Sequence, residues 1–178
     1  MAGCPALANT AYLGRHNQLA QLIHQELGFK YVLLDRKTTP PYYKYNPQPV
    51  VERGNVILYW DRPIVTDQTI DYNRPGILLI NQDEKTATLV EIAVPLTHNL
   101  KKTEAEKMAK YEELAFQLKS ILETGKRCHC TNNNFRRRSN LKENNIKHRE
   151  LAVNKNILRM GQKAVLLQNC HLVRKFLN

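Results

Sequence analysis

The fold of this protein is decided by residues 77–94, ILLINQDEKTATLVEIAV. Two short runs rich in β-branched residues, Ile77–Ile80 and Ala87–Val94, flank a polar connector of hairpin length. This pattern predicts two antiparallel strands joined by a turn. The second run contains Glu91 among apolar neighbours, and a carboxylate in such a strand needs a partner, a metal ion or a shifted pKa.

The register of this hairpin identifies the position that faces Glu91. If the turn centres on Asp83 and Glu84, Glu91 lies directly opposite position 76, with the two Cβ atoms about 4.5–5.5 Å apart. Two carboxylates at that separation can share one divalent cation. Position 76 is a glycine, however, so the cross-strand partner has no side chain.

The segments before the hairpin predict a helix, a loop and a further strand. Residues 15–27 carry leucine and isoleucine at helical spacing, and Gly28 is a suitable stop. Residues 36–54 contain four prolines and are typical of an extended loop. Val56–Trp60 predicts a strand. Three tyrosines of the loop could stack on bases, but packing over the sheet is the favoured interpretation: Tyr42, Tyr43 and Tyr45.

The segments after the hairpin predict two more helices. The first is one long helix over 104–123, with Thr103 as its N-cap and Glu106 completing a capping box. Residues 124–148 are rich in Asn and Arg with few large hydrophobes, which predicts a disordered linker. Helical spacing returns from Lys155 to Leu177.

Length and composition bound the class of protein. The 178 residues suffice for one domain of ordinary size, and we expect an α/β domain over 1–123, a basic linker over 124–148 and a helical segment over 149–178. No apolar run approaches the ~18 residues of a membrane span. No secretory signal peptide is recognisable before Arg15, the first basic residue. Together with four cysteines that we expect to be reduced thiols, this indicates an intracellular protein without a membrane partner.

The net charge of +11 is concentrated in the last third of the chain. Residues 121–178 hold thirteen Lys and Arg but three Glu, whereas the rest is nearly neutral. This asymmetry indicates contact with nucleic acid or another anionic surface, or else a solvated tail. No phosphate-binding loop, dinucleotide fingerprint, nucleophile elbow or HExxH motif points to a small-molecule substrate.

Two lysines in the first turns of the predicted helix, Lys107 and Lys110, are candidate partners of Glu91. Lys107 lies one turn before Tyr111, at the edge of the apolar face, so its ammonium can reach back over the sheet. It could orient a water molecule or stabilise charge on a phosphate. Alternatively, it forms an ion pair that satisfies a half-buried Glu91.

Several spaced motifs resemble one family in a single order: Arg15-His16-Asn17, Tyr59-Trp60-Asp61-Arg62-Pro63-Ile64, Asn73-Arg74-Pro75-Gly76-Ile77, Glu91-Ile92-Ala93-Val94-Pro95, Glu106-Lys107, Lys110-Tyr111, and Gln162 through Leu177. They are similar to the C-terminal region of non-LTR retrotransposon reverse transcriptase polyproteins. The last domain of those proteins resembles a restriction-enzyme-like endonuclease of the PD-(D/E)XK type. The resemblance covers roughly 1–122 and 147–178.

The resemblance implies a PD-(D/E)XK-like α/β core with a short mixed sheet flanked by helices. It implies that Glu91 is a catalytic residue and metal ligand and that Lys107 or Lys110 supplies the catalytic lysine. In intact relatives two carboxylates would hold Mg²⁺ and the domain would nick target DNA, in the nucleus. It also implies DNA, or element RNA, as partner, and we expect contacts from Arg15, His16, Arg74, Arg136, Arg137 and Arg138.

The departures from the family imply a truncated and degenerate member. Gly76 stands where the family has an aspartate, so we expect no bound Mg²⁺ and no cleavage here. Residues 123–146 do not match, which leaves the fourth core strand incomplete. The resemblance does not extend to the polymerase domain of those polyproteins, and Cys4 is expected to be the edge of an upstream zinc motif. A zinc site built on Cys128, His129 and Cys130 is disfavoured, because the Cys-x-Cys spacing is short and no second close pair supports it.

Three rival functions remain on sequence grounds. The chain could be a non-enzymatic nucleic-acid-binding remnant that acts through its basic C-terminal third. It could be an active nuclease in which Asp71 or Asp83 replaces the missing carboxylate. It could also be an interaction module built on the C-terminal helix. Cleavage of plasmid DNA separates the second from the others.

The concentration of basic residues generates a prediction about salt. Binding to duplex DNA should be independent of sequence, and if about six phosphates are contacted the logarithm of affinity should fall with the logarithm of salt with a slope of about −5. Fluorescence anisotropy on two unrelated duplexes between about 50 and about 200 mM salt measures this slope. An affinity that salt leaves unchanged, or that depends on sequence, would contradict the prediction.

Overall fold

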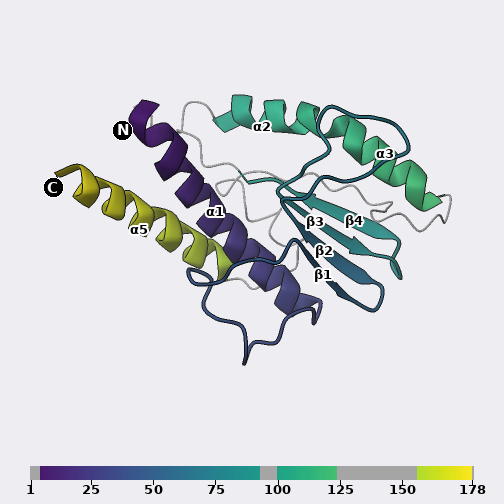
Figure 1. Cartoon of the computed structure of the whole chain (residues 1–178), viewed down its shortest axis with the longest axis horizontal. Helices are drawn as coiled ribbons and strands as arrows, with labels where there is room; N and C mark the ends of the chain where they lie inside the picture. Colours follow the sequence, from purple (N-terminus) through teal and green to yellow (C-terminus); the bar gives the residue numbers. More distant parts are fainter. Residues whose placement is uncertain (1–4, 93–99, 124–155, 178) are drawn as a thin grey trace.

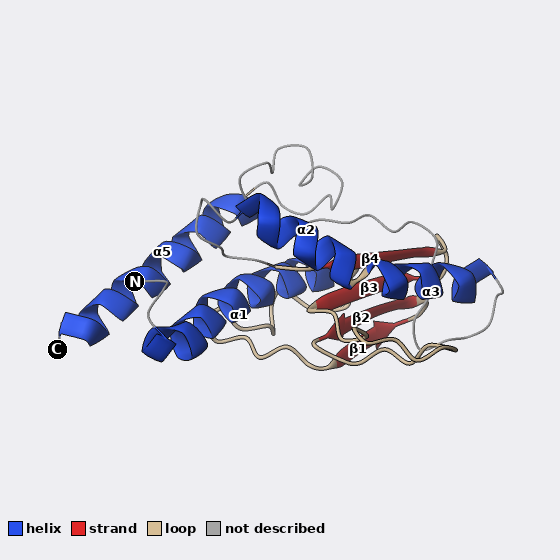
Figure 2. Cartoon of the chain, turned by 90° about the horizontal axis from the view of Figure 1, so that it is seen from above, coloured by secondary structure: helices blue, strands red, loops and turns tan. Residues whose placement is uncertain are grey.

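The computed structural model describes residues 5–92, 100–123 and 156–177. Within them a four-stranded sheet lies between two layers of helices (Figures 1 and 2). The helices are α1 (Pro5–Lys30), α2 (Leu100–Lys110), α3 (Glu112–Glu123) and α5 (Ile157–Leu177). The mixed α/β content expected from the sequence is confirmed.

The sheet is antiparallel throughout the described residues, with the order β1 (Val50–Arg53), β2 (Val56–Trp60), β3 (Ile77–Asn81) and β4 (Thr86–Val90). The expectation of a mixed sheet is therefore wrong for this part of the chain. β1 was expected to be loop, but a two-residue turn at Gly54–Asn55 folds it back on β2, and Gly54 supplies the positive φ of 61° that the turn needs. The incomplete strand of the family pattern, over 123–146, falls almost entirely outside the described residues.

The predicted hairpin and its register are confirmed. β3 and β4 pair from Ile77↔Val90 to Asn81↔Thr86, and the turn lies between them. The second strand ends at Val90 instead of Val94, and residues 93–99 lie outside the described part. Because the next pair in this register is Gly76 and Glu91, the two residues lie side by side at the end of the hairpin.

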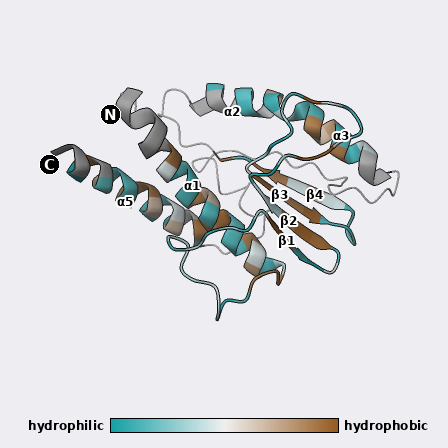
Figure 3. Ribbon diagram, viewed as in Figure 1, coloured by the Kyte–Doolittle hydropathy of each residue, from teal (hydrophilic) through white to brown (hydrophobic). Residues whose placement is uncertain are grey.

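Side chains alternate along the strands, so apolar residues of the sheet reach both of its faces. Much of the sheet is hydrophobic, as its brown stretches in Figure 3 show. On one face Leu78 and Ile80 pack against Leu114 and Leu118 of α3. On the other face Ile77 and Leu79, together with Leu58 and Val90, pack against four residues of α1: Leu19, Ala20, Leu22 and Leu27. A sheet buried on both faces explains why β3 is almost entirely apolar.

Helix α1 is longer than the predicted 15–27. It continues through Gly28 to Lys30, so Gly28 does not stop the helix. Its lack of a side chain serves a close approach instead, because a Cβ there would lie 2.5 Å from Leu34 Cδ1. The backbone amides of Leu33 and Leu34 both donate to the Gly28 carbonyl, at 2.8 and 3.1 Å, which closes the end of the helix.

The single helix predicted over 104–123 is wrong in two respects. It begins at Leu100, so Thr103 lies inside α2 and is not an N-cap, and it is interrupted at Tyr111. Tyr111 is buried and its hydroxyl donates to the Arg74 carbonyl at 3.0 Å. The chain is thus attached to the sheet at this junction, while Leu114 and Leu118 of α3 fix the next turns on the sheet face.

Helix α5 lies along α1 (Figure 1). Its first residue, Ile157, belongs to the core between α1 and the sheet, and Arg15 of α1 donates from an Nη atom to Asn169 Oδ1 at 3.0 Å. The linker predicted over 124–148 lies outside the described residues. Among the described helices none is long and apolar enough to cross a membrane.

The tyrosine-rich loop packs against α1 through a buried histidine. The Tyr45 hydroxyl and His24 Nδ1 are hydrogen-bonded at 3.0 Å, and Trp60 meets the His24 ring edge-on. Burial lowers the pKa of His24 from 6.5 to about 4 and raises the pKa of Tyr45 to about 12. The His24 Nε2 atom has no hydrogen-bond partner within the described part of the chain.

This buried histidine predicts a loss of stability in mild acid. Between pH 6.5 and about 4 the imidazole is protonated in the unfolded chain but neutral in the folded protein. The unfolded state therefore binds more protons, and the free energy of unfolding should fall by roughly 3 kcal/mol as the pH is lowered through that window. Urea denaturation of the protein and of His24→Gln at several pH values isolates the contribution. Equal pH slopes for the two proteins would refute it.

Candidate functional site

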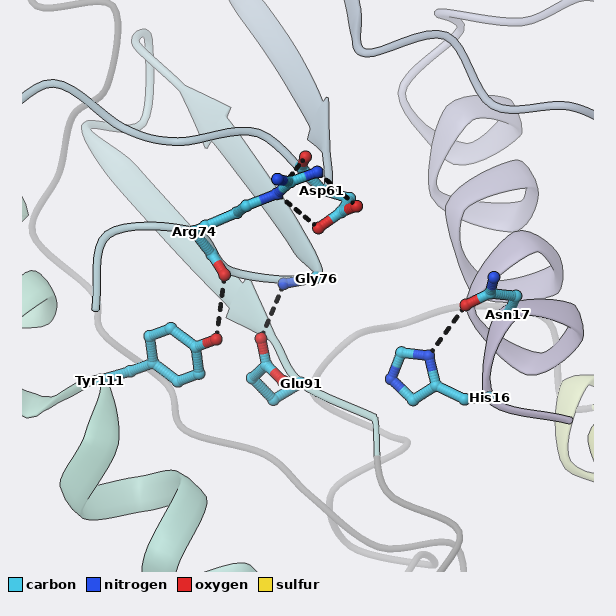
Figure 4. Close-up of polar contacts among 7 residues, drawn as sticks. All are labelled: His16, Asn17, Asp61, Arg74, Gly76, Glu91 and Tyr111. Carbon is cyan, nitrogen blue, oxygen red and sulfur yellow. Dashed lines mark hydrogen bonds and ion pairs between the residues drawn. The ribbon is translucent and has the colours of Figure 1, made fainter. Parts of the chain in front are cut away.

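The site is built at the ends of β3 and β4, where Gly76 faces Glu91 (Figure 4). The Gly76 amide donates to Glu91 Oε1 at 2.7 Å. A Cβ at position 76 would lie 3.6 Å from the same oxygen. A side chain at position 76 would thus have pointed directly at the Glu91 carboxylate, as the sequence predicts.

Lys107 of α2 forms an ion pair with the other oxygen of this carboxylate. Its ammonium lies 2.8 Å from Glu91 Oε2 and donates at 2.8 Å to the Ile92 carbonyl. The side chains of Glu91 and Lys107 are 10% and 24% exposed, so the pair is largely shielded from water. Of the two roles considered for Lys107, the structure shows the ion pair. Both carboxylate oxygens are engaged by the protein's own donors.

Tyr111 closes the site on the side of α3. The phenol approaches Glu91 and Asp61 closely enough for both charges to act on it, and its hydroxyl donates to the Arg74 carbonyl. Burial, followed by the negative charges of Glu91 and Asp61, raises the pKa of Tyr111 well above its usual value. The phenol therefore stays protonated and remains a hydrogen-bond donor that ties residue 74 to the helices.

Arg74, expected to contact nucleic acid, is committed to Asp61. Its Nε and Nη2 atoms lie 2.9 and 2.8 Å from the two Asp61 carboxylate oxygens, a bidentate pair. Asp61 is opposite Gly76 in the β2–β3 register, and its amide donates to the Gly76 carbonyl at 2.9 Å. Sequence reasoning missed Asp61, although pairing Val56–Trp60 with Ile77–Ile80 would have placed it there.

Lys110 does not reach Glu91. Its Nζ atom lies 5.0 Å from the centre of the Tyr72 ring and 4.9 Å from that of Tyr111. The two candidate lysines thus have different partners. Residues three apart on a helix share a face but lie about one turn apart along the helix axis. Lys107 is the lysine of the site.

Figure 4 also labels His16 and Asn17, which belong to the basic motif of α1. His16 Nδ1 is hydrogen-bonded to Asn17 Oδ1 at 3.1 Å, and Arg15 is bonded to Asn169 of α5. The buried Arg15 Nε has no hydrogen-bond partner within the described residues. Arg136, Arg137 and Arg138, and the cysteines of the disfavoured zinc site, lie outside the described part of the chain.

Both proposed substitute carboxylates lie within the described residues. Asp83 accepts a hydrogen bond from Asn55 at 2.7 Å, at the opposite end of the hairpin, and Asp71 is exposed on the loop between β2 and β3. Among the described residues no group of three or more His, Cys, Asp or Glu side chains is placed to hold a metal ion. Both Glu91 oxygens are engaged by the protein's own donors, and both Asp61 oxygens by Arg74.

Comparison with known proteins adds no relative: no family model, no curated protein and no solved structure matches this chain. What the site can do is therefore judged from its own residues.

The buried ion pair predicts unequal effects of two lysine substitutions. Lys107→Met leaves the Glu91 carboxylate half-buried without its cation and should lower the free energy of unfolding by about 1–2 kcal/mol. Lys102→Met removes an exposed pair with Glu106 and should cost less than about 0.5 kcal/mol. Adding Glu91→Gln to Lys107→Met should recover part of the loss. Urea denaturation measures all of them, and equal costs for the two lysines would contradict the prediction.

Proposed function

We propose that this chain is a retrotransposon-derived endonuclease-like domain that no longer cleaves DNA. The observation that carries the proposal is the state of Glu91, whose two oxygens accept from the Gly76 amide and the Lys107 ammonium. A carboxylate at the end of a hairpin strand and a lysine that reaches it from α2 support the proposal. Position 76, where the resemblance implies a second carboxylate, is a glycine, and the nearby Asp61 carboxylate is paired with Arg74.

The chemistry of phosphodiester hydrolysis explains why this loss matters. A divalent cation activates water and neutralises the scissile phosphate, and it is held by carboxylates that the protein keeps available. Here the Glu91 carboxylate is neutralised by Lys107 at 2.8 Å, and the nearby Asp61 carboxylate is neutralised by Arg74, also at 2.8 Å. Binding a metal ion at Glu91 would require its ion pair with Lys107 to break, with no second side chain at position 76 to compensate.

A second candidate function is binding of nucleic acid without cleavage, through the basic C-terminal third. Three basic residues are exposed along α5 while Ala164 is buried: Arg159, Lys163 and Arg174. Such a face supports electrostatic contact with the backbone of DNA or of element RNA. A nuclear location belongs to the same proposal. The two functions are compatible, because loss of the metal site leaves the basic face intact.

Restoring the carboxylate at position 76 tests the first proposal. A Cβ at Gly76 meets only ordinary contacts of 3.6 Å or more, and its φ lies outside the left-handed region, so Gly76→Asp should fold. The original protein should neither bind Mn²⁺ detectably at millimolar concentrations nor nick a supercoiled plasmid. Gly76→Asp should show measurable Mn²⁺ binding in a calorimetric titration.

Two further variants make the result specific. Gly76→Asn has the same shape without the charge and should not bind Mn²⁺, and Gly76→Asp with Glu91→Ala should lose the binding gained. If the original protein binds Mn²⁺ and nicks DNA, loss of activity is disproved. If Gly76→Asp gains nothing over Gly76→Asn, positions 76 and 91 do not form a metal site, and the endonuclease-like assignment fails.

A further inference from the structure

The loop between β2 and β3, residues 61–76, is anchored at its base and along its length. The Asp61 amide donates to the Gly76 carbonyl and the Ile64 amide to the Asn73 carbonyl, at 2.9 and 2.8 Å. The bidentate Arg74–Asp61 pair reinforces the base. Ile64 and Ile70 are buried in the core under α3. These contacts restrain the backbone of the loop, so its exposed side chains have defined positions.

Tyr72 is the aromatic residue of this loop, and its ring is accessible to solvent. Its side chain is 53% exposed, whereas Tyr111 beside it is 5% exposed. The ammonium of Lys110, also an exposed residue, lies 5.0 Å from the Tyr72 ring centre. An accessible aromatic ring and a cation are thus held together one helical turn from Lys107.

Of the charged side chains near Tyr72, Lys110 is the cation that lies at the ring. The Asp61 carboxylate is neutralised by Arg74, and Lys107 is neutralised by Glu91. Asp71 precedes Tyr72 and is exposed, so it repels a phosphate that approaches from its own side. A phosphate is therefore best received on the side of α2, where Lys110 lies.

Resting on the function proposed above, we propose that Tyr72 and Lys110 bind an unpaired nucleotide of single-stranded DNA. The base stacks on the face of the Tyr72 ring that Lys110 does not cover, and the Lys110 ammonium contacts the adjoining phosphate. Bases inside a duplex are already stacked on one another and cannot use the ring. This surface therefore favours single-stranded over double-stranded DNA, whereas the basic C-terminal third attracts both.

Fluorescence anisotropy with a labelled oligonucleotide of about 12 residues tests the proposal, with the same strand annealed to its complement as the duplex probe. Salt near 150 mM weakens purely electrostatic binding. Tyr72→Ala should weaken binding of the single strand about fivefold or more and leave the duplex unchanged. Tyr72→Phe keeps the ring and should bind as the original protein does, and Lys110→Gln should weaken the single strand about twofold or more.

Tyr43→Ala is the matched control, because Tyr43 is 59% exposed on the other tyrosine-bearing loop. It should leave both affinities unchanged. Equal losses for Tyr43→Ala and Tyr72→Ala, equal losses on single strand and duplex, or no loss for Tyr72→Ala would each overturn the proposal. The Mn²⁺ titration of Gly76→Asp reports on the endonuclease-like site separately, so the stacking surface and that site can fail independently.

Discussion

The engagement of the Glu91 carboxylate is the constraint on which the rest of the structure depends. A carboxylate in an apolar strand end must be neutralised and hydrogen-bonded, or it destabilises the fold. The Gly76 amide and the Lys107 ammonium do this at 2.7 and 2.8 Å. Lys107 can reach Glu91 only if α2 lies over the end of the hairpin, and this attachment fixes where the helical layer meets the sheet.

The attachment of α2 also explains the interruption between the two helices. Lys107 holds α2 at the sheet end, whereas Leu118 holds α3 on the sheet face. Tyr111, between them, is buried and bonded to the Arg74 carbonyl. The same contact ties the loop over 61–76 to the helices. Ion pair, phenol and loop therefore form one connected structure around Glu91, and each part limits the movement of the others.

Much of the centre was predictable because it depends on local pairing. The alternation of residues and the polar turn define the hairpin register, and register alone places Gly76 opposite Glu91. The reach of Lys107 to Glu91 follows from helical spacing. Asp61 and β1 were not found, because they depend on pairing with β2 and on a turn within a proline-rich segment. Helical spacing alone does not separate Lys110 from Lys107, because it does not show which partner each ammonium reaches.

The sequence by itself determined the hairpin, the glycine that lies opposite Glu91, and a pair of lysines, one of which reaches the Glu91 carboxylate. These follow from residue type and spacing within about 30 residues of chain, where covalent geometry restricts the possible contacts. Only the tertiary structure decided that His24 is buried against Tyr45 and that α5 lies along α1. Local periodicity does not show which distant segments come together. Helices with similar apolar faces could pack on the sheet in many ways, and the need to bury both sheet faces selects one of them.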